Sequence, residues 1–317
     1  MSRSFIESRN KIISEPVVTV ILFVFNHARF LAKTLKSIEI QSLKNDFEII
    51  IHDDASTDGS IDICKRFQTE SAHSVTILQQ TLNKVGRKIS FWPEIIERCR
   101  GNLIAITDGD DFWATPLKLE IQCNALGVLP NVDLCFHRVV TVDHASEEVT
   151  GPLCDYGDEP KLFSTATVIE GDGGFMPTVS LMFRKSVLQN LPQWFFRPPT
   201  VEDYFLQIQG SLRGGAIYLP LWGGIRREGD PNSWTQRTIN DTKILSTFRI
   251  NLITNMLDLA ETIPSHFLPN LEKVIMRYFF LVCTDAMTRR QYNDVWRASE
   301  ILNSRRILFE GNDLSGT

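Results

Sequence analysis

The chain lacks the features that mark several large classes of protein. It has only six cysteines among 317 residues, and no two of them form a C-x-x-C pair. This spacing argues against a disulfide framework and against a zinc site, and it favours buried thiols in a reducing compartment. The net charge is −5 and no run of lysine and arginine is present. The sequence therefore does not support binding to nucleic acid.

No segment has the length or character of a membrane-spanning or targeting sequence. The longest early apolar run, from Val17 to Phe25, is far shorter than the ~20 residues that a transmembrane helix needs. Residues 1–11 lack the apolar core and the cleavage site of a signal peptide. We therefore expect a cytoplasmic protein, and peripheral association with the inner face of the membrane stays open as an alternative.

Strand and helix signals alternate between residues 16 and 140. Continuous apolar, β-branched runs predict five strands, at Val17–Val24, Phe47–Ile51, Val75–Leu78, Leu103–Thr107 and Val132–Phe136. Apolar residues at helical spacing lie between them, as at Leu31, Leu35 and Ile38, or at Phe91, Ile95 and Cys99. This alternation predicts an α/β fold with a sheet of parallel type covered by helices.

The pattern changes after residue 140. Residues 141–177 have weak periodicity, and we expect a long, partly irregular excursion there. Val179–Phe183 and Ala216–Leu219 are predicted strands, and Glu202–Leu212 is a predicted helix. Apolar stripes then predict a helical region at 231–317, whose stripes are best explained by core packing.

The apolar run 103–107 leads directly into three carboxylates, Asp108, Asp110 and Asp111. Carboxylates this close repel one another, and burying them without a partner is costly. A hard divalent cation such as Mg²⁺ or Mn²⁺ would offset this repulsion and would bridge to substrate phosphates. Because ligands of α/β proteins bind at the carboxyl ends of strands, the sequence predicts a metal-assisted site for a phosphate-bearing substrate.

Other candidates follow neighbouring elements. Asp53 and Asp54 end the second predicted strand, where a carboxylate can accept a hydrogen bond from a nucleobase or ribose or can cap a turn. Phe25 offers a flat surface to a base, or else a core ring. Glu202 and Asp203 begin a predicted helix, either as favourable charges at its N-terminus or as a general base.

Several common motifs are missing. No P-loop and no G-x-G-x-x-G after a strand occur. The acidic cluster is not followed by the alternating ligands of an EF-hand loop.

Five motifs in order resemble family 2 glycosyltransferases, over about residues 16–230. They are Thr19-Val-Ile-Leu-Phe-Val-Phe-Asn26, Phe47-Glu-Ile-Ile-Ile-His-Asp-Asp-Ala-Ser-Thr-Asp-Gly-Ser60, Asn83…Gly86, Asp108-Gly-Asp-Asp-Phe-Trp113 and Pro116-x-Lys-Leu-x-x-Gln122. The resemblance implies an inverting enzyme of the GT-A fold, a Rossmann-like mixed sheet flanked by helices. It also implies a nucleotide-sugar donor and a Mg²⁺ or Mn²⁺ ion held by the D-x-D motif. The expected organisation is a lead at 1–15, the GT-A domain at 16–230 and the helical region at 231–317.

The resemblance also implies roles for particular residues. Asp203 would be the catalytic base. The donor would contact Phe25, Asp53, Asp54, Asn83, Asp108, Asp110 and Arg226, and the metal would be held by Asp110, Asp111 and Glu228. Lys118 and Gln122 would fix the helix behind the site.

One stretch departs from the family pattern. Relatives often carry Tyr-Arg-x-His shortly after the last strand, where this chain has Ile225-Arg-Arg-Glu228. Glu228 could ligate a metal in place of the histidine, although it would repel phosphate, and Arg226 or Arg227 could offset the charge of a diphosphate.

The predicted function is sugar transfer from a nucleotide-diphosphate sugar to the hydroxyl of a glycan or lipid-linked glycan, in bacterial surface polysaccharide or glycan synthesis. Two alternatives stay open. A non-catalytic nucleotide-sugar-binding protein on the same scaffold is favoured by Glu228. A nucleotidyltransferase would normally show a Gly-rich, basic loop after the first strand, where this chain has Phe25-Asn-His-Ala-Arg-Phe30.

Overall fold

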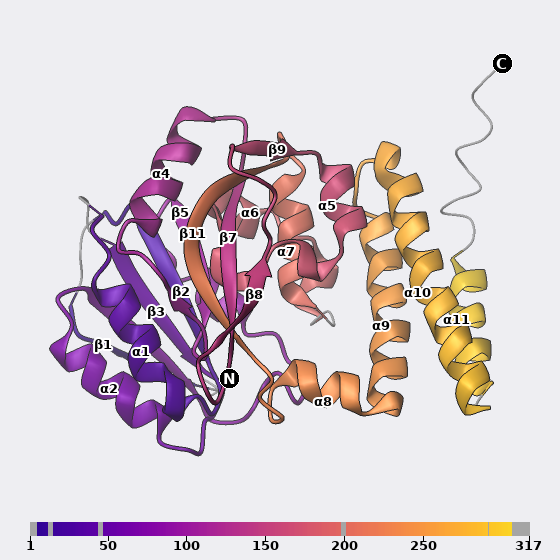
Figure 1. Ribbon diagram of the computed structural model, residues 1–317, viewed down its shortest axis with the longest axis horizontal. Coiled ribbons are helices and arrows are strands. Elements are labelled where there is room, and N and C mark those ends of the chain that lie inside the picture. Colours follow the sequence, from indigo (N-terminus) through magenta and orange to yellow (C-terminus); the bar gives the residue numbers. More distant parts are fainter. Residues whose placement is uncertain (1–4, 12–14, 44–46, 198–200, 291, 306–317) are drawn as a thin grey trace.

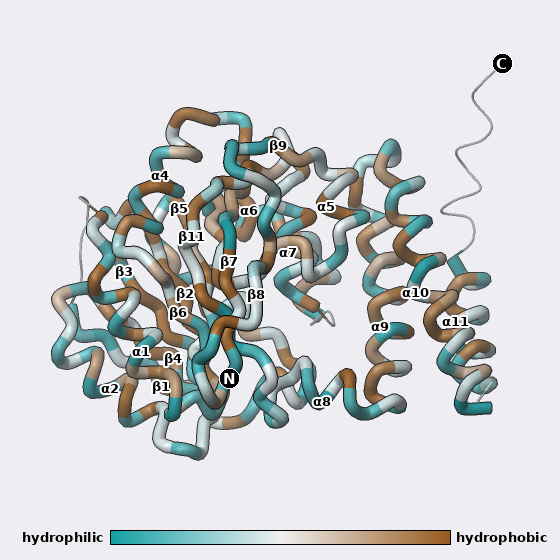
Figure 2. Tube along the Cα trace, in the orientation of Figure 1, coloured by the Kyte–Doolittle hydropathy of each residue, from teal (hydrophilic) through white to brown (hydrophobic). Residues whose placement is uncertain are grey.

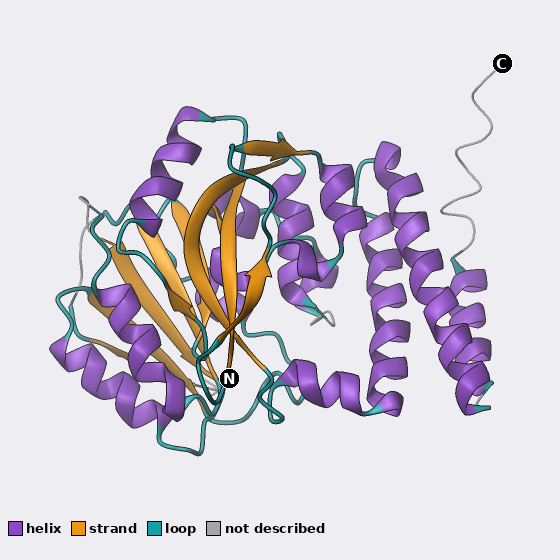
Figure 3. Cartoon of the chain, viewed as in Figure 1, coloured by secondary structure: helices purple, strands orange, loops and turns teal. Residues whose placement is uncertain are grey.

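The computed structural model describes residues 5–11, 15–43, 47–197, 201–290 and 292–305. These residues form a mixed sheet of eleven strands flanked by helices (Figure 1, Figure 3). The strands are β1 (Phe5–Arg9), β2 (Val18–Val24), β3 (Phe47–Asp53), β4 (Ser74–Gln80), β5 (Leu103–Asp108), β6 (Phe112–Trp113), β7 (Leu134–Asp143), β8 (Val149–Leu153), β9 (Lys161–Phe163), β10 (Met182–Arg184) and β11 (Ala216–Glu228).

The sheet has the order β1-β4-β3-β2-β5-β10-β7-β11-β6, with β8 paired to β7 and β9 to β11. Strands β4, β3, β2 and β5 are parallel, as the alternating pattern predicts. Antiparallel β10 then lies between β5 and β7, and the sheet becomes mixed. The chain runs from β2 to β3 and β4 on one side and returns to β5 on the other, so the order reverses beside β2. Such a reversal is where open α/β sheets bind ligands.

Helices cover both faces of the sheet. They are α1 (Ala28–Glu39), α2 (Ser60–Glu70), α3 (Trp92–Ile96), α4 (Lys118–Val128), α5 (Thr165–Gly171), α6 (Lys185–Gln189), α7 (Glu202–Ser211), α8 (Trp234–Asn240), α9 (Thr242–Ala260), α10 (Leu268–Arg289) and α11 (Asn293–Ser304). One hydrophobic core lies under α1, α2 and α4, and the other under α3, α5, α6, α7, α9 and α10. Alternate residues of each central strand point into different cores. In β2, Val20 and Leu22 lie in the core under α1, α2 and α4, and Ile21 lies in the other core.

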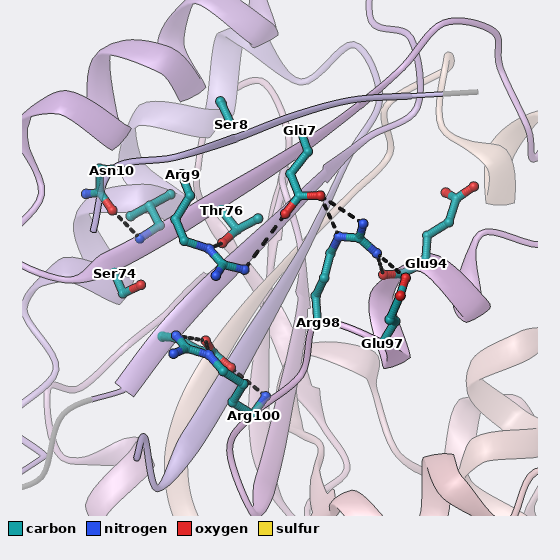
Figure 4. Close-up of polar contacts among 12 residues, drawn as sticks. Glu7, Ser8, Arg9, Asn10, Ser74, Thr76, Glu94, Glu97, Arg98 and Arg100 are labelled. Carbon is teal, nitrogen blue, oxygen red and sulfur yellow. Dashed lines mark hydrogen bonds and ion pairs between the residues drawn. The ribbon is translucent and has the colours of Figure 1, made fainter. Parts of the chain in front are cut away.

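Strand β1 lies within the predicted lead 1–15 and forms an edge of the sheet, antiparallel to β4. Polar contacts hold it there (Figure 4). The Arg98 guanidinium donates to Glu7 at 2.8 and 3.0 Å, and Arg9 Nε donates to Thr76 Oγ1 at 2.7 Å. The sequence does not reveal this strand, because only its first residue, Phe5, reaches the hydrophobic core and no apolar run marks the rest.

Three segments differ from the sequence prediction. The excursion 141–177 is more regular than expected, since it contains the end of β7 together with β8, β9 and α5. The helix predicted from Phe91 to Cys99 is only the short α3. The strand predicted at Val179–Phe183 is a 3₁₀ turn, η2 (Thr178–Ser180), followed by β10.

Strand β11 is much longer than the predicted Ala216–Leu219, because it continues through a bulge. Its register with β7 shifts between Leu219 and Trp222 and again before Gly224. Pro220 and the Gly223-Gly224 pair lie in this irregular part and obscure the strand pattern in the sequence. The extension carries Arg226 and Glu228, which sequence reasoning placed beyond the last strand.

Helices α8 to α11 fall within the predicted helical region, and α9, α10 and α11 lie beside one another (Figure 1). Hydrophilic and hydrophobic stretches alternate along them, as expected for helices with one buried face (Figure 2). In the part of the chain that the structure describes, no helix is long and apolar enough to cross a membrane. All six cysteines are free. The division at 15 and 230 stays a prediction, and residues 1–4, 12–14 and 306–317 of its outer parts lie outside the described residues.

Candidate active site

The two acidic strand ends lie on either side of β2. In the sheet register, Asp53 of β3 pairs with Val24, and Asp108 of β5 pairs with Phe23. Since all three strands are parallel, their carboxyl ends meet at one edge of the sheet. The structure therefore brings the aspartates of both predicted motifs to the same edge, next to the reversal of strand order.

Backbone contacts from three elements fix the acidic loop after β5. Gly109 N donates to Phe23 O of β2 at 2.8 Å, and Thr34 Oγ1 of α1 donates to Gly109 O and Asp111 O at 2.9 and 2.6 Å. The Asp111 carboxylate accepts from Arg227 N of β11 at 2.9 Å and is buried. Asp110 is different, because its carboxylate is 29% exposed and lies 3.9 Å from His27 Nε2. Asp110 is thus more open to a ligand than the buried Asp111.

The electrostatics of this loop favour a cation. Burial raises the pKa of Asp108, the carboxylates of Asp110 and Asp203 raise it further, and Arg226 opposes them. Burial also raises the pKa of Asp111, with Asp110 and Asp108 adding to the effect. Oxygen ligands crowded in this way suit a hard divalent ion.

No three His, Cys, Asp or Glu side chains converge as a preformed metal site anywhere in the described ranges. Mg²⁺ is commonly held by one or two carboxylates and completed by substrate phosphates and water. Asp108 and Asp110, which are both partly exposed, fit that mode of binding.

Asp203 lies at the start of α7 and is oriented by two hydrogen bonds. Its Oδ2 accepts from Thr178 Oγ1 at 3.0 Å and its Oδ1 accepts from the Tyr204 backbone N–H at 2.9 Å. Burial raises the pKa of Asp203, while these hydrogen bonds and Arg226 counteract the increase. A buried carboxylate with a raised pKa is suited to accept a proton.

Glu202, the neighbour of Asp203 at the start of α7, links this helix to α3. Its Oε2 accepts from Trp92 Nε1 of α3 at 2.7 Å. Burial raises the pKa of Glu202 to about 7, with the charges of Asp203 and Asp54 contributing. The carboxylates of Asp54, Glu202, Asp203 and Asp108 are therefore close enough to influence one another across the site.

Asp54 holds the segment that follows β4. Its Oδ1 accepts from Lys84 N at 2.6 Å and its Oδ2 accepts from Val85 N at 3.1 Å. Asn83 Oδ1 accepts from Gly86 N within the same segment. The Asp54 side chain is buried, and each of its oxygens accepts one of these backbone N–H groups.

Asp53 and Phe25 lie beside this segment with different exposure. Asp53 is buried and accepts from Ser56 N at 3.2 Å, and burial raises its pKa. Phe25 directly follows β2, and its ring is 38% exposed.

Residues 118 and 122 lie behind the acidic loop. The Lys118 ammonium is fully buried 4.2 Å from the centre of the Trp113 ring, and burial lowers its pKa to about 7. Gln122 Nε2 donates to Ser180 O at 2.8 Å. These contacts join α4 to the acidic loop and to η2, which precedes β10.

Alternate residues of β11 have different roles. The Arg227 guanidinium packs between the rings of Phe30 and Phe112, each 4.8 Å away. Arg226 acts electrostatically on Asp108, Asp111 and Asp203. Glu228 is exposed. Among the described residues, its carboxylate has no hydrogen bond or electrostatic interaction with Asp108, Asp111 or Asp203. The structure thus brings Arg226, but not Glu228, into the cluster.

Sequence reasoning missed the side chains that orient the carboxylates, namely Trp92, Thr178 and His27. Thr178 is 25 residues from Asp203 in the chain, and Trp92 is 110 residues from Glu202. No local pattern predicts such contacts, because they arise only when the sheet brings the elements together.

Comparisons with known proteins agree with this picture. The family model described as Glycosyl transferase family 2 matches residues 19–191, more than half of the chain. An uncharacterized protein of Mycobacterium bovis is 26% identical over 222 residues, covering 68% of this chain and 60% of that protein. The chain thus spans less than two thirds of the length of this relative.

Two further proteins are similar in sequence or in fold. The putative teichuronic acid biosynthesis glycosyltransferase TuaG of Bacillus subtilis is 34% identical over 110 residues, which are 34% of this chain and 41% of that protein. The crystal structure of S. aureus TarS 1–349 in complex with UDP-GlcNAc matches with a TM-score of 0.56 and 13% identity, covering 92% of this chain and 91% of that one. At this identity the structural likeness bears on the fold alone, and it confirms the predicted GT-A fold.

Proposed function

We propose, from the premise that the chain belongs to glycosyltransferase family 2, that it is an inverting, metal-dependent transferase of the hexosyltransferase type. The donor would be a nucleotide-diphosphate sugar and the acceptor a hydroxyl group of a glycan or lipid-linked glycan. The observation that carries this proposal is the grouping of Asp108, Asp110, Asp203 and Arg226 at one edge of the sheet.

Asp203 is the proposed base. Its carboxylate takes the proton of the acceptor hydroxyl as the acceptor oxygen bonds to the anomeric carbon of the sugar. The bond between that carbon and the diphosphate oxygen breaks in the same step, and its electron pair leaves with the nucleoside diphosphate. One displacement of this kind inverts the configuration at the anomeric carbon. Thr178 and the Tyr204 N–H keep the base in position before the acceptor arrives.

The donor would lie over the ends of β2, β3 and β5. Asp54 would accept from the base, with Phe25 beside it and Asp53 and Asn83 supporting the surrounding turns. Asp108 would lie near the ribose, and Arg226 would offset the charge of the diphosphate.

Asp110 is the proposed metal ligand, because its carboxylate is more accessible than that of Asp111. Mg²⁺ or Mn²⁺ bound there would neutralise the charge that develops on the leaving diphosphate. Asp111 and Glu228 stay predicted metal ligands, but Asp110 is preferred. The Asp111 carboxylate already accepts a hydrogen bond from Arg227 N, and Glu228 is exposed and lies apart from the cluster.

The relatives support the choice of pathway. TuaG is described by a role in teichuronic acid biosynthesis, and TarS was solved with UDP-GlcNAc. We therefore propose a role in surface polysaccharide or glycan synthesis, and we propose that the protein acts in the cytoplasm or at the inner face of the membrane.

The test is a panel of UDP-, GDP- and dTDP-sugars with Mn²⁺, scored by donor turnover and by thermal shift. We expect one donor to raise the melting temperature of the wild type, because a ligand that binds only the folded state stabilises it. Asp203→Asn and Asp110→Ala should each abolish turnover while circular dichroism stays unchanged. Asp203→Asn should still show the donor-induced shift, and Asp110→Ala should show a smaller one.

Two outcomes would overturn parts of the proposal. Turnover retained by Asp203→Asn would remove the base assignment. A wild type that binds a donor but turns it over neither with Mn²⁺ nor with EDTA would be the non-catalytic binding protein instead.

A further inference from the structure

A cleft of about 450 Å³ lies beside the candidate active site. It is lined by Lys88, Ile89 and Ser90 on one wall and by Phe196 and Arg197 on the other. The first wall belongs to the segment that Asp54 holds after β4, and the second includes the end of the 3₁₀ turn η3 (Gln193–Phe196).

Two cations face this cleft without a partner. Neither the Lys88 ammonium nor the Arg197 guanidinium makes a hydrogen bond or an ion pair with any residue in the described part of the chain, and both side chains are exposed. Lys84, four residues earlier, is instead buried and paired with Glu94. Among the described residues that line the cleft there is no carboxylate, although the chain carries a net charge of −5. The cleft is therefore a locally basic site in an acidic protein.

The two walls of the cleft meet at Trp92. Trp92 N donates to Ser90 Oγ at 3.4 Å, and the Trp92 ring centroid lies 5.9 Å from that of Phe195, next to Phe196. The indole Nε1 of the same residue donates to Glu202, the neighbour of the proposed base. The cleft is thus connected through Trp92 to Glu202, the neighbour of the proposed base.

We propose that this cleft binds a phosphate group carried by the acceptor substrate. An arginine fork matches phosphate oxygens in pairs and a lysine adds a point charge, so the two side chains form a suitable cradle. Ile89 and Phe196 offer apolar surface to the carbon skeleton next to the phosphate. The diphosphate of the donor is already assigned to Arg226 and the metal. The inference rests on the proposed function, and it narrows the acceptor to a phosphate-bearing glycan or lipid.

The test measures phosphate binding by the full chain apart from turnover. Glycerol 3-phosphate serves as the soluble probe, and vesicles containing phosphatidic acid serve as the lipid probe. The variants are Lys88→Ala/Arg197→Ala and, as a control with the same loss of charge, Lys65→Ala/Arg66→Ala on the exposed face of α2. We expect the first double variant to bind at least one probe about tenfold more weakly or worse. The control should bind like the wild type.

The probe that loses affinity identifies the source of the phosphate, soluble glycan or lipid. Saturating UDP with Mn²⁺ should not displace the probe, because the donor has its own site. Equal affinity of the wild type and the double variant for both probes, or displacement by UDP, would overturn the inference. Donor hydrolysis without acceptor should be unchanged in the double variant. If the wild type itself did not hydrolyse the donor, this result would count against the proposed function and not against phosphate binding.

Discussion

Glu202 and Asp203 are adjacent in the chain, yet their surroundings give them different tasks. Asp203 accepts two hydrogen bonds and lies near Arg226, which favours its charged form. Glu202 accepts one bond from Trp92 and has two carboxylates nearby, so its charged form is disfavoured. We infer that Asp203 accepts the proton and that Glu202 ties the start of α7 to α3.

The surroundings of Glu202 predict how stability depends on pH. Its folded-state pKa is raised from 4.5 to about 7, so the folded state binds more protons than the unfolded state between these values. The stability from this group is complete below pH 4.5 and is lost as the pH rises through about 7. Glu202→Gln keeps the acceptor for Trp92 and removes the ionisation. Its stability relative to wild type should improve by on the order of 2 kcal/mol between pH 4.5 and 8.

Melting temperatures of both proteins across this pH range measure the difference. Glu70→Gln, an exposed carboxylate at the end of α2, is the control and should follow the wild type at each pH. Parallel curves for wild type and Glu202→Gln would show that the pKa of Glu202 does not differ between the folded and unfolded states.

At the residue scale, the sequence identifies the acids but not what surrounds them. Asp108, Asp110 and Asp203 could be selected because they follow a strand or begin a helix. Their exposure could not be predicted, because it depends on contacts such as that of Arg227 N with Asp111. This is why Asp110 and Asp111 look equivalent in the sequence and differ in the structure.

At the level of elements, Asp54 connects β3 to the segment after β4. Both of its oxygens accept backbone N–H groups, and Lys84 N is buried with its acceptor. Asp54→Asn would leave one N–H facing an amide NH₂ instead of an oxygen. An unsatisfied buried donor costs about 1–3 kcal/mol, so the segment should open more often.

Hydrogen exchange of the Lys84 and Val85 amides measures this opening. We expect faster exchange there in Asp54→Asn and unchanged exchange in the centre of β2. Asp62→Asn, on the exposed side of α2, controls for loss of a carboxylate. Equal protection in the variant would show that the segment does not depend on Asp54.

The predictability of the elements follows from their burial. Strands β2 to β5 have both faces covered, so continuous apolar runs reveal them. Strand β1 is an edge strand held by Arg9 and Arg98, and β11 bends through Gly223 and Gly224. Strands β1 and β11 therefore lack the hydrophobic pattern in the sequence on which strand prediction depends.

At the scale of the whole molecule, the helical region and the sheet share one core. Buried residues of β5, α7 and α10, such as Ile104, Phe205 and Leu271, belong to the same hydrophobic cluster. Polar contacts join α10 to α5, since Asn270 Nδ2 and Lys273 Nζ both donate to Glu170 Oε1, at 2.6 and 2.8 Å. Helix α10 therefore depends on the α/β part for its packing.

Because of this shared core, we expect that the helical region 231–317 does not unfold separately from the sheet. Leu271 is fully buried, and Leu271→Ala should lower the free energy of unfolding by about 2–5 kcal/mol through lost contacts and a cavity. Met276→Ala, at a position that is 50% exposed on the same helix, should change it by less than about 0.5 kcal/mol. Because the core is continuous, Leu271→Ala should destabilise β2 and α10 by the same amount in native-state hydrogen exchange. If α10 alone lost protection while β2 kept the wild-type value, the helices would be a separately folding unit, and the contacts with α5 would be those of an interface between domains.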